Sequence, residues 1–222
     1  MIFKTEAENF HLFESYKERN LYYKIIGGYL LNVIIEGYEE RKEKLLGLLL
    51  NIRKDEERFI DPFNKAQIVF EALQKETWDI TFDYHIVQIL QSEIVDRGEM
   101  SDILLLTKSS LVSFECKYLS DFNIDKDIHA VQDRITQFYG TTGRTPLQVL
   151  LLKKDKWHYS SKIKTRLSCK PESINIPIIV LFWEELIDII DDYRVKNFLN
   201  KQIQRASSPA AYRSISLGRR RM

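Results

Sequence analysis

After Ser92 the chain changes from long amphipathic stretches to short apolar runs, and this change constrains the fold most strongly. Each run has the length of a β-strand and lies between polar residues. Amphipathic helices are expected at about residues 125–139 and from about Glu184 onward. The order of helix, three strands, helix, strand, strand and helix predicts an α/β fold, with a mixed central β-sheet flanked by helices. The five expected strands are Glu93–Asp96, Asp102–Leu106, Leu111–Tyr118, Leu147–Leu152 and Ile176–Trp183.

The first sixty residues carry apolar side chains at three- and four-residue spacing, which is typical of helices. They are therefore interpreted as an N-terminal helical lobe, residues 1–60. Asp61 and Pro62 mark its end, and Asn64 is expected to cap a helix that runs to about Lys75. The stretch 79–91 favours helix over strand. The main domain would then span 61–205, followed by a basic tail at 206–222.

Composition excludes several classes of protein. The longest apolar runs fall well short of the about 20 residues that a membrane-spanning helix needs, and no signal-peptide pattern is present, so we expect a soluble, cytoplasmic protein that makes no membrane contact. The two cysteines, Cys116 and Cys169, are too few for a disulfide framework or a zinc site. Any metal ion would therefore be held by oxygen ligands.

The charge is unevenly distributed along the chain. The formal net charge is +1, yet residues 193–222 contribute +8 with no acidic residue, so residues 1–192 carry about −7. A second basic cluster lies at Lys153–Arg166. Both segments predict contact with a polyanion, although a solvated loop would show the same composition.

Two apolar runs on either side of the polar break 107–110 predict a β-hairpin. If Leu106 pairs with Leu111, counting outward along the two strands sets Asp102 directly opposite Glu115. Like charges that face each other across two strands are destabilising unless something compensates them. A divalent cation bound between the two carboxylates would provide that compensation.

Side chains alternate between the two faces of a strand, so Ser113, Glu115 and Lys117 are expected to share one face. The opposite set is apolar and predicts the core: Val112, Phe114, Cys116 and Tyr118. Carboxylate oxygens suit Mg²⁺ or Mn²⁺. The alternative is a solvated strand face, and the similar triplet Glu40–Lys42 is interpreted as an exposed helical charge run.

The helix expected at 125–139 adds one further candidate. Gln132 is the one polar residue in its apolar stripe, and a buried amide needs hydrogen-bond partners. Those partners would be either groups of the site next to it or main-chain groups of the core. The stripe consists of Ile128, Val131, Ile135, Phe138 and Tyr139.

Taken together, these residues resemble the signature of the PD-(D/E)xK nuclease superfamily, which has the restriction-endonuclease-like fold. The match consists of Ser101-Asp102, Glu115-Cys116-Lys117 and a following helix with Gln132, on an αβββαβ order over about residues 64–185. Ser101 stands where the motif has proline. By this resemblance, residues 61–205 would form a nuclease-like domain.

The resemblance implies metal-dependent hydrolysis of phosphodiester bonds in DNA, by an endonuclease that acts in restriction, defence, recombination or repair. Asp102, Glu115 and the main-chain carbonyl of Cys116 would hold Mg²⁺, for which Mn²⁺ can substitute. Lys117 would orient the attacking water or stabilise negative charge on the phosphate, and Gln132 would position Lys117 or the water. A further acid from the preceding helix would be Glu71 or Asp83.

Two alternatives stay open. An RNA endonuclease of the cap-snatching type shares the acidic residues and the lysine, and it adds a histidine for which His85 is the candidate. A nucleic-acid-binding module could keep this fold without catalysis. The N-terminal lobe could mediate target recognition or a homodimer.

Overall fold

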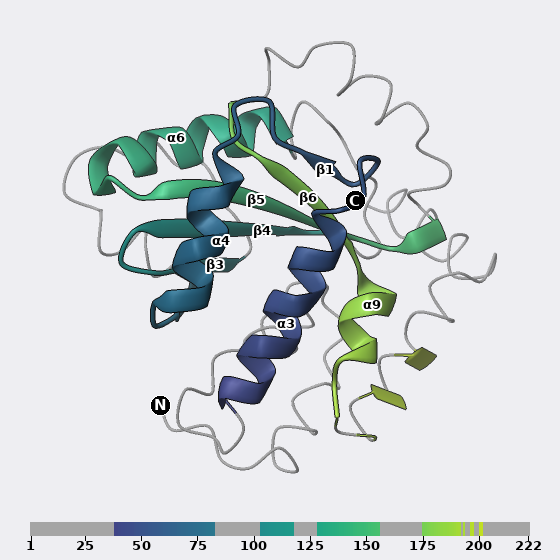
Figure 1. Cartoon of the computed structure of the whole chain (residues 1–222). Helices are drawn as coiled ribbons and strands as arrows, with labels where there is room; N and C mark the ends of the chain where they lie inside the picture. Colours follow the sequence, from purple (N-terminus) through teal and green to yellow (C-terminus); the bar gives the residue numbers. More distant parts are fainter. Residues whose placement is uncertain are drawn as a thin grey trace, which may run out of the picture.

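A six-stranded mixed sheet forms the centre of the protein (Figure 1). The computed structural model describes residues 38–82, 103–117, 128–155 and 175–191, together with residues 193, 196, 197, 200 and 201. Along the sheet the strands follow the order β1-β6-β5-β4-β3-β2. Their bounds are β1 Phe59–Ile60, β2 Asp79–Phe82, β3 Ile103–Leu106, β4 Ser110–Cys116, β5 Thr145–Leu152 and β6 Ile178–Phe182.

Three neighbouring strands, β4, β5 and β6, run parallel to one another. The remaining strands are antiparallel to their neighbours, with β3 on β4, β2 on β3 and β1 on β6. The protein is therefore an α/β protein whose mixed sheet is flanked by helices, as the sequence predicted. The helices named below are α3 Tyr38–Ile52, α4 Ala66–Lys75, α6 Ala130–Thr142 and α9 Trp183–Asp188.

Helices cover both faces of the sheet, which gives three layers (Figure 1). On one face, α3, α4 and α9 share a continuous apolar core with the sheet, in which Phe70 of α4 and Phe114 of β4 are both buried. On the other face, α6 packs through Val131 and Ile135 onto Leu104 and Leu111. The strands read as nearly continuous apolar runs because both of their faces are covered.

The hairpin between β3 and β4 has the register predicted from the sequence. Leu106 pairs with Leu111, and Leu104 pairs with Ser113. The predicted turn is tied to the end of α4, because the main-chain N–H and the hydroxyl of Ser109 donate to the carboxylate of Glu76, the residue that follows α4, at 2.9 and 2.6 Å. The expected strand at 93–96 lies outside the described residues.

The helical interpretation of 79–91 is wrong where the structure describes it. Residues Asp79–Phe82 form β2, which pairs with β3 in the register Asp79 to Leu106. The segment alternates polar and apolar residues and contains the β-branched Ile80 and Thr81, which favour a strand when a partner strand is at hand. The partner strand β3 comes more than twenty residues later in the sequence, so the local pattern alone could not distinguish a strand from a helix here.

The predicted boundary at residue 60 also needs correction for the described residues. Leu45, Leu49 and Ile52 of α3 belong to the same apolar core as the sheet, and β1 is the edge strand beside β6. Residues 38–60 are therefore part of the sheet domain. Residues 1–37 and the tail at 206–222 lie outside the described residues.

The N-cap position of α4 is Lys65 rather than Asn64, and the side chain of Asp61 accepts from the main chain at the start of the helix. The Asp61 carboxylate accepts hydrogen bonds from the main-chain N–H groups of Lys65 and Ala66, at 2.9 and 3.0 Å. Asn64 instead has a φ of 54°, a left-handed conformation that asparagine tolerates better than most residues. In the part of the chain that is described, no helix has the length and apolar character to cross a bilayer.

Candidate functional site

The parallel strands β4, β5 and β6 end at the same edge of the sheet, which is where ligands commonly bind in open α/β sheets. Each strand is followed at once by a residue that has a polar group: Lys117 after β4, Lys153 after β5 and Trp183 after β6. This edge is also where β3 begins, because β3 runs antiparallel to β4. Three residues of the predicted site, Glu115, Cys116 and Lys117, lie at this edge.

Glu115 and Lys117 are in contact at the end of β4. The Lys117 Nζ atom lies 2.9 Å from the Glu115 Oε1 atom, and the two side chains are 15% and 12% exposed. Their neighbours Phe114 and Cys116 are buried in the core on the opposite face, so strand alternation directs Glu115 to the face that α6 covers. The structure thus brings together the carboxylate and the ammonium that the sequence singled out.

The main-chain carbonyl of Cys116 has a defined direction. The N–H of Lys117 donates to the carbonyl of Leu151 in β5, at 2.8 Å. Because the peptide bond is planar and trans, the carbonyl of Cys116 points the opposite way, toward the β3 side of β4. The oxygen predicted as a metal ligand therefore faces the strand that follows Asp102 in the sequence.

Asp102 lies outside the described residues, which begin again at Ile103. The pairing of Ile103 with Phe114 is the last described pair of this ladder before Glu115. Within the described residues, no group of three or more histidine, cysteine or acidic side chains comes together. The oxygens of Glu115 and Cys116 are hard donors of the kind that Mg²⁺ prefers, so their chemistry fits that ion.

Gln132 has hydrogen bonds that do not involve the candidate site. Its side-chain NH₂ donates to Gln148 Oε1 at 3.2 Å and to the carbonyl of Ile176 at 3.1 Å. Its oxygen accepts from the main-chain N–H of Asn175, at 3.1 Å. Both amide hydrogens thus bind groups of the core, which agrees with the alternative that Gln132 is a core residue and not part of the site.

The position of Gln148 explains why Gln132 is remote from Lys117. Gln148 pairs with Ser113, four residues before Lys117 on β4. At 3.3 Å per residue, that separation is about 13 Å along the strand. Sequence reasoning missed the fully buried Gln148 as a partner of Gln132, because residues on β5 and α6 that meet in this way leave no local sequence signal.

The structure does not bring Glu71 to the site. Glu71 lies on the exposed side of α4, accepts a hydrogen bond from Gln67 and is 3.8 Å from the Lys75 ammonium. Since α4 covers the face of the sheet opposite to Glu115, this choice for the further acid is wrong. Asp83 and His85 lie outside the described residues. Glu40, in the triplet that we set aside, lies exposed on α3 as predicted.

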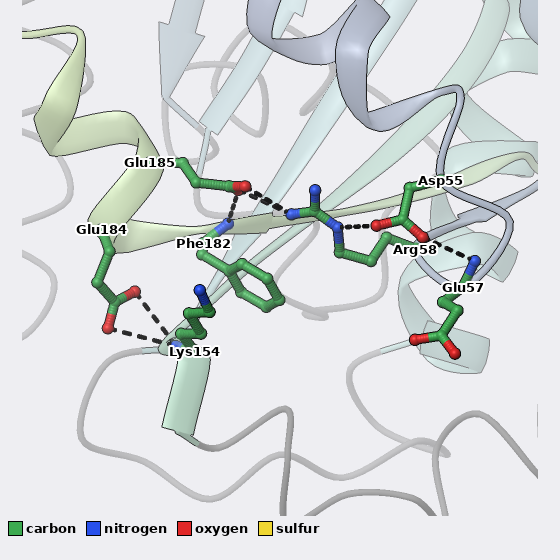
Figure 2. A network of polar contacts seen from close by, with 7 residues as sticks. All are labelled: Asp55, Glu57, Arg58, Lys154, Phe182, Glu184 and Glu185. Carbon is green, nitrogen blue, oxygen red and sulfur yellow. Dashed lines mark hydrogen bonds and ion pairs between the residues drawn. The ribbon is translucent and has the colours of Figure 1, made fainter.

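The two basic segments are described only in part. Lys153 is 2% exposed and its ammonium contacts Asp155 at 3.2 Å, so it belongs to the interior and not to a solvated basic surface. The side chain of Lys154 is exposed, while its main-chain N–H donates to Glu184 (Figure 2). Lys196 contacts the carbonyl of Asp188 at 3.0 Å. Residues 156–174 and 202–222 lie outside the described residues.

A second polar network, which no sequence pattern predicted, lies next to this edge of the sheet (Figure 2). Arg58 contacts Asp55 and Glu185, each at 2.7 Å. Glu185 also accepts the main-chain N–H of Phe182, at 3.1 Å, which stabilises the start of α9. Burial opposes the charged form of Arg58, but the hydrogen bonds to Glu185 and Asp55 outweigh it and raise its pKa.

The fold and this edge define the chain as an α/β protein with an acid and a lysine in contact where its parallel strands end. Comparisons with protein-family models, with curated proteins and with solved structures found no match.

Proposed function

We propose that this protein is a metal-dependent phosphodiesterase that cleaves DNA endonucleolytically, with its active site at the end of β4. The observation that supports this most directly is the 2.9 Å contact between Glu115 and Lys117 at the carboxyl edge of the parallel strands. A carboxylate and an amine held side by side at a ligand-binding edge suit phosphoryl chemistry.

The topology gives separate support. The elements α4, β2, β3, β4, α6 and β5 follow one another as helix, three antiparallel strands, helix and a strand parallel to the third. That order agrees with the αβββαβ core of the superfamily that the sequence resembles. Continuing the register of β3 and β4 by one pair would set Asp102 opposite Glu115.

The residues have distinct roles in this proposal. Asp102, Glu115 and the carbonyl of Cys116 would hold Mg²⁺, which when bound polarises the scissile phosphate and acidifies a water. Lys117 donates hydrogen bonds either to the attacking water or to the phosphate oxygens, where negative charge grows in the transition state. Gln132 has no part in the proposal, because both hydrogens of its amide are bound to core groups.

A nucleic acid is proposed as the substrate because the chain pairs an acidic main part with a basic C-terminal end, and DNA is chosen over RNA on the resemblance to the nuclease superfamily. Residues 193–222 contribute +8 with no acidic residue. Basic side chains there would neutralise phosphates and bring the nucleic acid to an acidic centre that would otherwise repel it.

The test is incubation with supercoiled plasmid, linear duplex DNA and RNA, each with Mg²⁺, Mn²⁺ or a chelator. We expect metal-dependent nicking or linearisation of DNA by the wild type. Asp102→Ala, Glu115→Gln and Lys117→Ala should each lower the cleavage rate by about 100-fold or more, the loss typical of removing one electrostatic catalytic group.

The chain offers a matched control for these variants. Glu40→Gln changes the acid of the other Glu-x-Lys triplet, on α3, and should leave the cleavage rate unchanged. Equal cleavage by the wild type, Glu115→Gln and Lys117→Ala would refute the assigned site. Metal-dependent cleavage of RNA alone would favour the RNA endonuclease, and DNA binding without cleavage would favour the silent module.

A further inference from the structure

The main chain at Lys117 is held from two directions, although β4 has already ended at Cys116. On one side its N–H donates to the carbonyl of Leu151, at 2.8 Å. On the other, its carbonyl accepts a hydrogen bond from the indole Nε1 of Trp183, at 3.2 Å. The indole thus provides a partner for a carbonyl that lies beyond the regular ladder.

These two bonds fix the geometry of the candidate site. The first orients the peptide plane between Cys116 and Lys117, and the second orients the plane that follows Lys117. Two fixed planes on either side of a Cα atom determine the direction of its Cα–Cβ bond. The Lys117 side chain and the Cys116 carbonyl are therefore oriented together, next to the Glu115 carboxylate.

Trp183 is itself firmly placed. It is the first residue of α9, is 1% exposed and packs in the core shared by α3, α4 and α9. The residue before it, Phe182, donates its main-chain N–H to Glu185, which Arg58 contacts at 2.7 Å (Figure 2). Glu185, two residues after Trp183, thus ties the start of α9 both to Phe182 at the end of β6 and to Arg58 in the loop before β1.

We propose that Trp183 is a positioning residue, whose indole N–H holds the main chain of Lys117 and thereby sets the metal affinity of the site. This inference rests on the proposed function and extends it to a residue 66 positions further along the chain. Catalysis requires such groups to be held to within a fraction of an ångström by their supporting contacts, and a single lost contact is sufficient to loosen them.

The chain contains a matched control for this hydrogen bond. Trp78 is 2% exposed, and its indole Nε1 donates to the carbonyl of Leu73 at 2.9 Å, after the end of α4. Trp183→Phe and Trp78→Phe each remove one indole–carbonyl hydrogen bond from a buried tryptophan and the same volume of ring. Both variants should lose similar stability in urea, whereas only Trp183→Phe alters a contact to Lys117.

The experiment measures the MnCl₂ concentration that gives half-maximal plasmid cleavage, and Mn²⁺ binding by titration calorimetry. Both are done well below the unfolding temperature of each variant. Trp183→Phe should raise the half-maximal concentration and the dissociation constant about five- to tenfold, as the loss of one neutral hydrogen bond predicts. Trp78→Phe should change either value less than about twofold, because distant sites act independently.

A second measurement uses the wild type and so does not depend on the folding of Trp183→Phe. The chain has three tryptophans, whose indole N–H signals can be assigned with Trp78→Phe and Trp157→Phe. Titration with MgCl₂ should shift the Trp183 signal and leave the Trp78 signal in place.

Each outcome decides between the two proposals. If the wild type cleaves with Mn²⁺ but Trp183→Phe behaves like Trp78→Phe, or the Trp183 signal does not shift, the role of Trp183 is refuted and the proposed function stands. If the wild type neither binds Mn²⁺ nor cleaves nucleic acid, the proposed function is refuted, and the role of Trp183 with it.

Discussion

Replacing Arg58 by methionine should destabilise the protein substantially, because this guanidinium joins the loop before β1 to the start of α9 (Figure 2). Its side chain is 16% exposed, and it contacts Asp55 and Glu185, each at 2.7 Å. It also lies over the ring of Phe182, 4.9 Å from the ring centroid. Methionine keeps much of the apolar stem and loses the charge and its hydrogen bonds.

The size of the effect follows from these contacts. A hydrogen bond to a charged group contributes about 1.5 to 3 kcal/mol, and the partly exposed Glu185 contact belongs to this class. Asp55 is more exposed and adds at most about 1 kcal/mol, and the ring contact adds about 0.5 kcal/mol. We therefore expect a loss of about 3 kcal/mol in the free energy of unfolding.

Urea denaturation measures this loss, as a fall of about 1 M or more in the midpoint. A double-mutant cycle of Arg58→Met with Glu185→Gln should give a coupling energy of about 1 to 2 kcal/mol. Glutamine is chosen because its side-chain oxygen can still accept the main-chain N–H of Phe182. Lys44→Met is the control, since the partners Glu40 and Asp191 of Lys44 are 67% and 65% exposed and its effect should be much smaller. Equal losses of unfolding free energy in Arg58→Met and Lys44→Met, or a coupling energy near zero between Arg58 and Glu185, would refute the reasoning.

Two further predictions concern other parts of the fold. Gly47→Ala, within α3, should raise the free energy of unfolding by about 0.5 to 1 kcal/mol, because the added Cβ atom meets nothing within 4 Å. Gly143→Ala, just after α6, should lower it by about 1 kcal/mol, because Gly143 has a φ of 70°. Urea titrations of the two variants check both values. The hydrogen bonds from Ser109 lower the pKa of Glu76 from 4.5 to about 2, so the ionised carboxylate stabilises the fold above pH 4.5 and this stability is lost as the pH falls toward 2. The urea midpoints of the wild type and Glu76→Gln should therefore converge between pH 4.5 and 2, and parallel curves would contradict this assignment.

The sequence predicted those features that depend on neighbouring residues. The β3–β4 hairpin has one polar break between two apolar strands, so its register follows from counting outward from Leu106 and Leu111, and its two faces follow from the alternation of side chains along a strand. For the same reason the contact between Glu115 and Lys117 was expected, since residues two apart on a strand share a face.

Features that depend on distant residues were not predicted. β2 forms because β3 pairs with it, and Gln132 is occupied by Gln148 and Ile176, which come from β5 and from the segment before β6. Trp183 reaches Lys117 only through the parallel arrangement of β4, β5 and β6. No local sequence pattern predicts these contacts, because parallel strands are joined by long connections whose sequence does not specify which strands pair.

Stability does not account for the charged pair at the end of β4. In the row across the sheet that contains Glu115, its partner Leu150 and the next residue Val180 are buried and apolar. A glutamate and a lysine that are 12% and 15% exposed lose most of their hydration there, and an ion pair so placed is often no more stabilising than well-packed apolar side chains. An apolar pair would serve the sheet at least as well. The proposed chemistry is assigned to this pair because it places charge where the parallel strands end, the edge at which ligands commonly bind in α/β sheets.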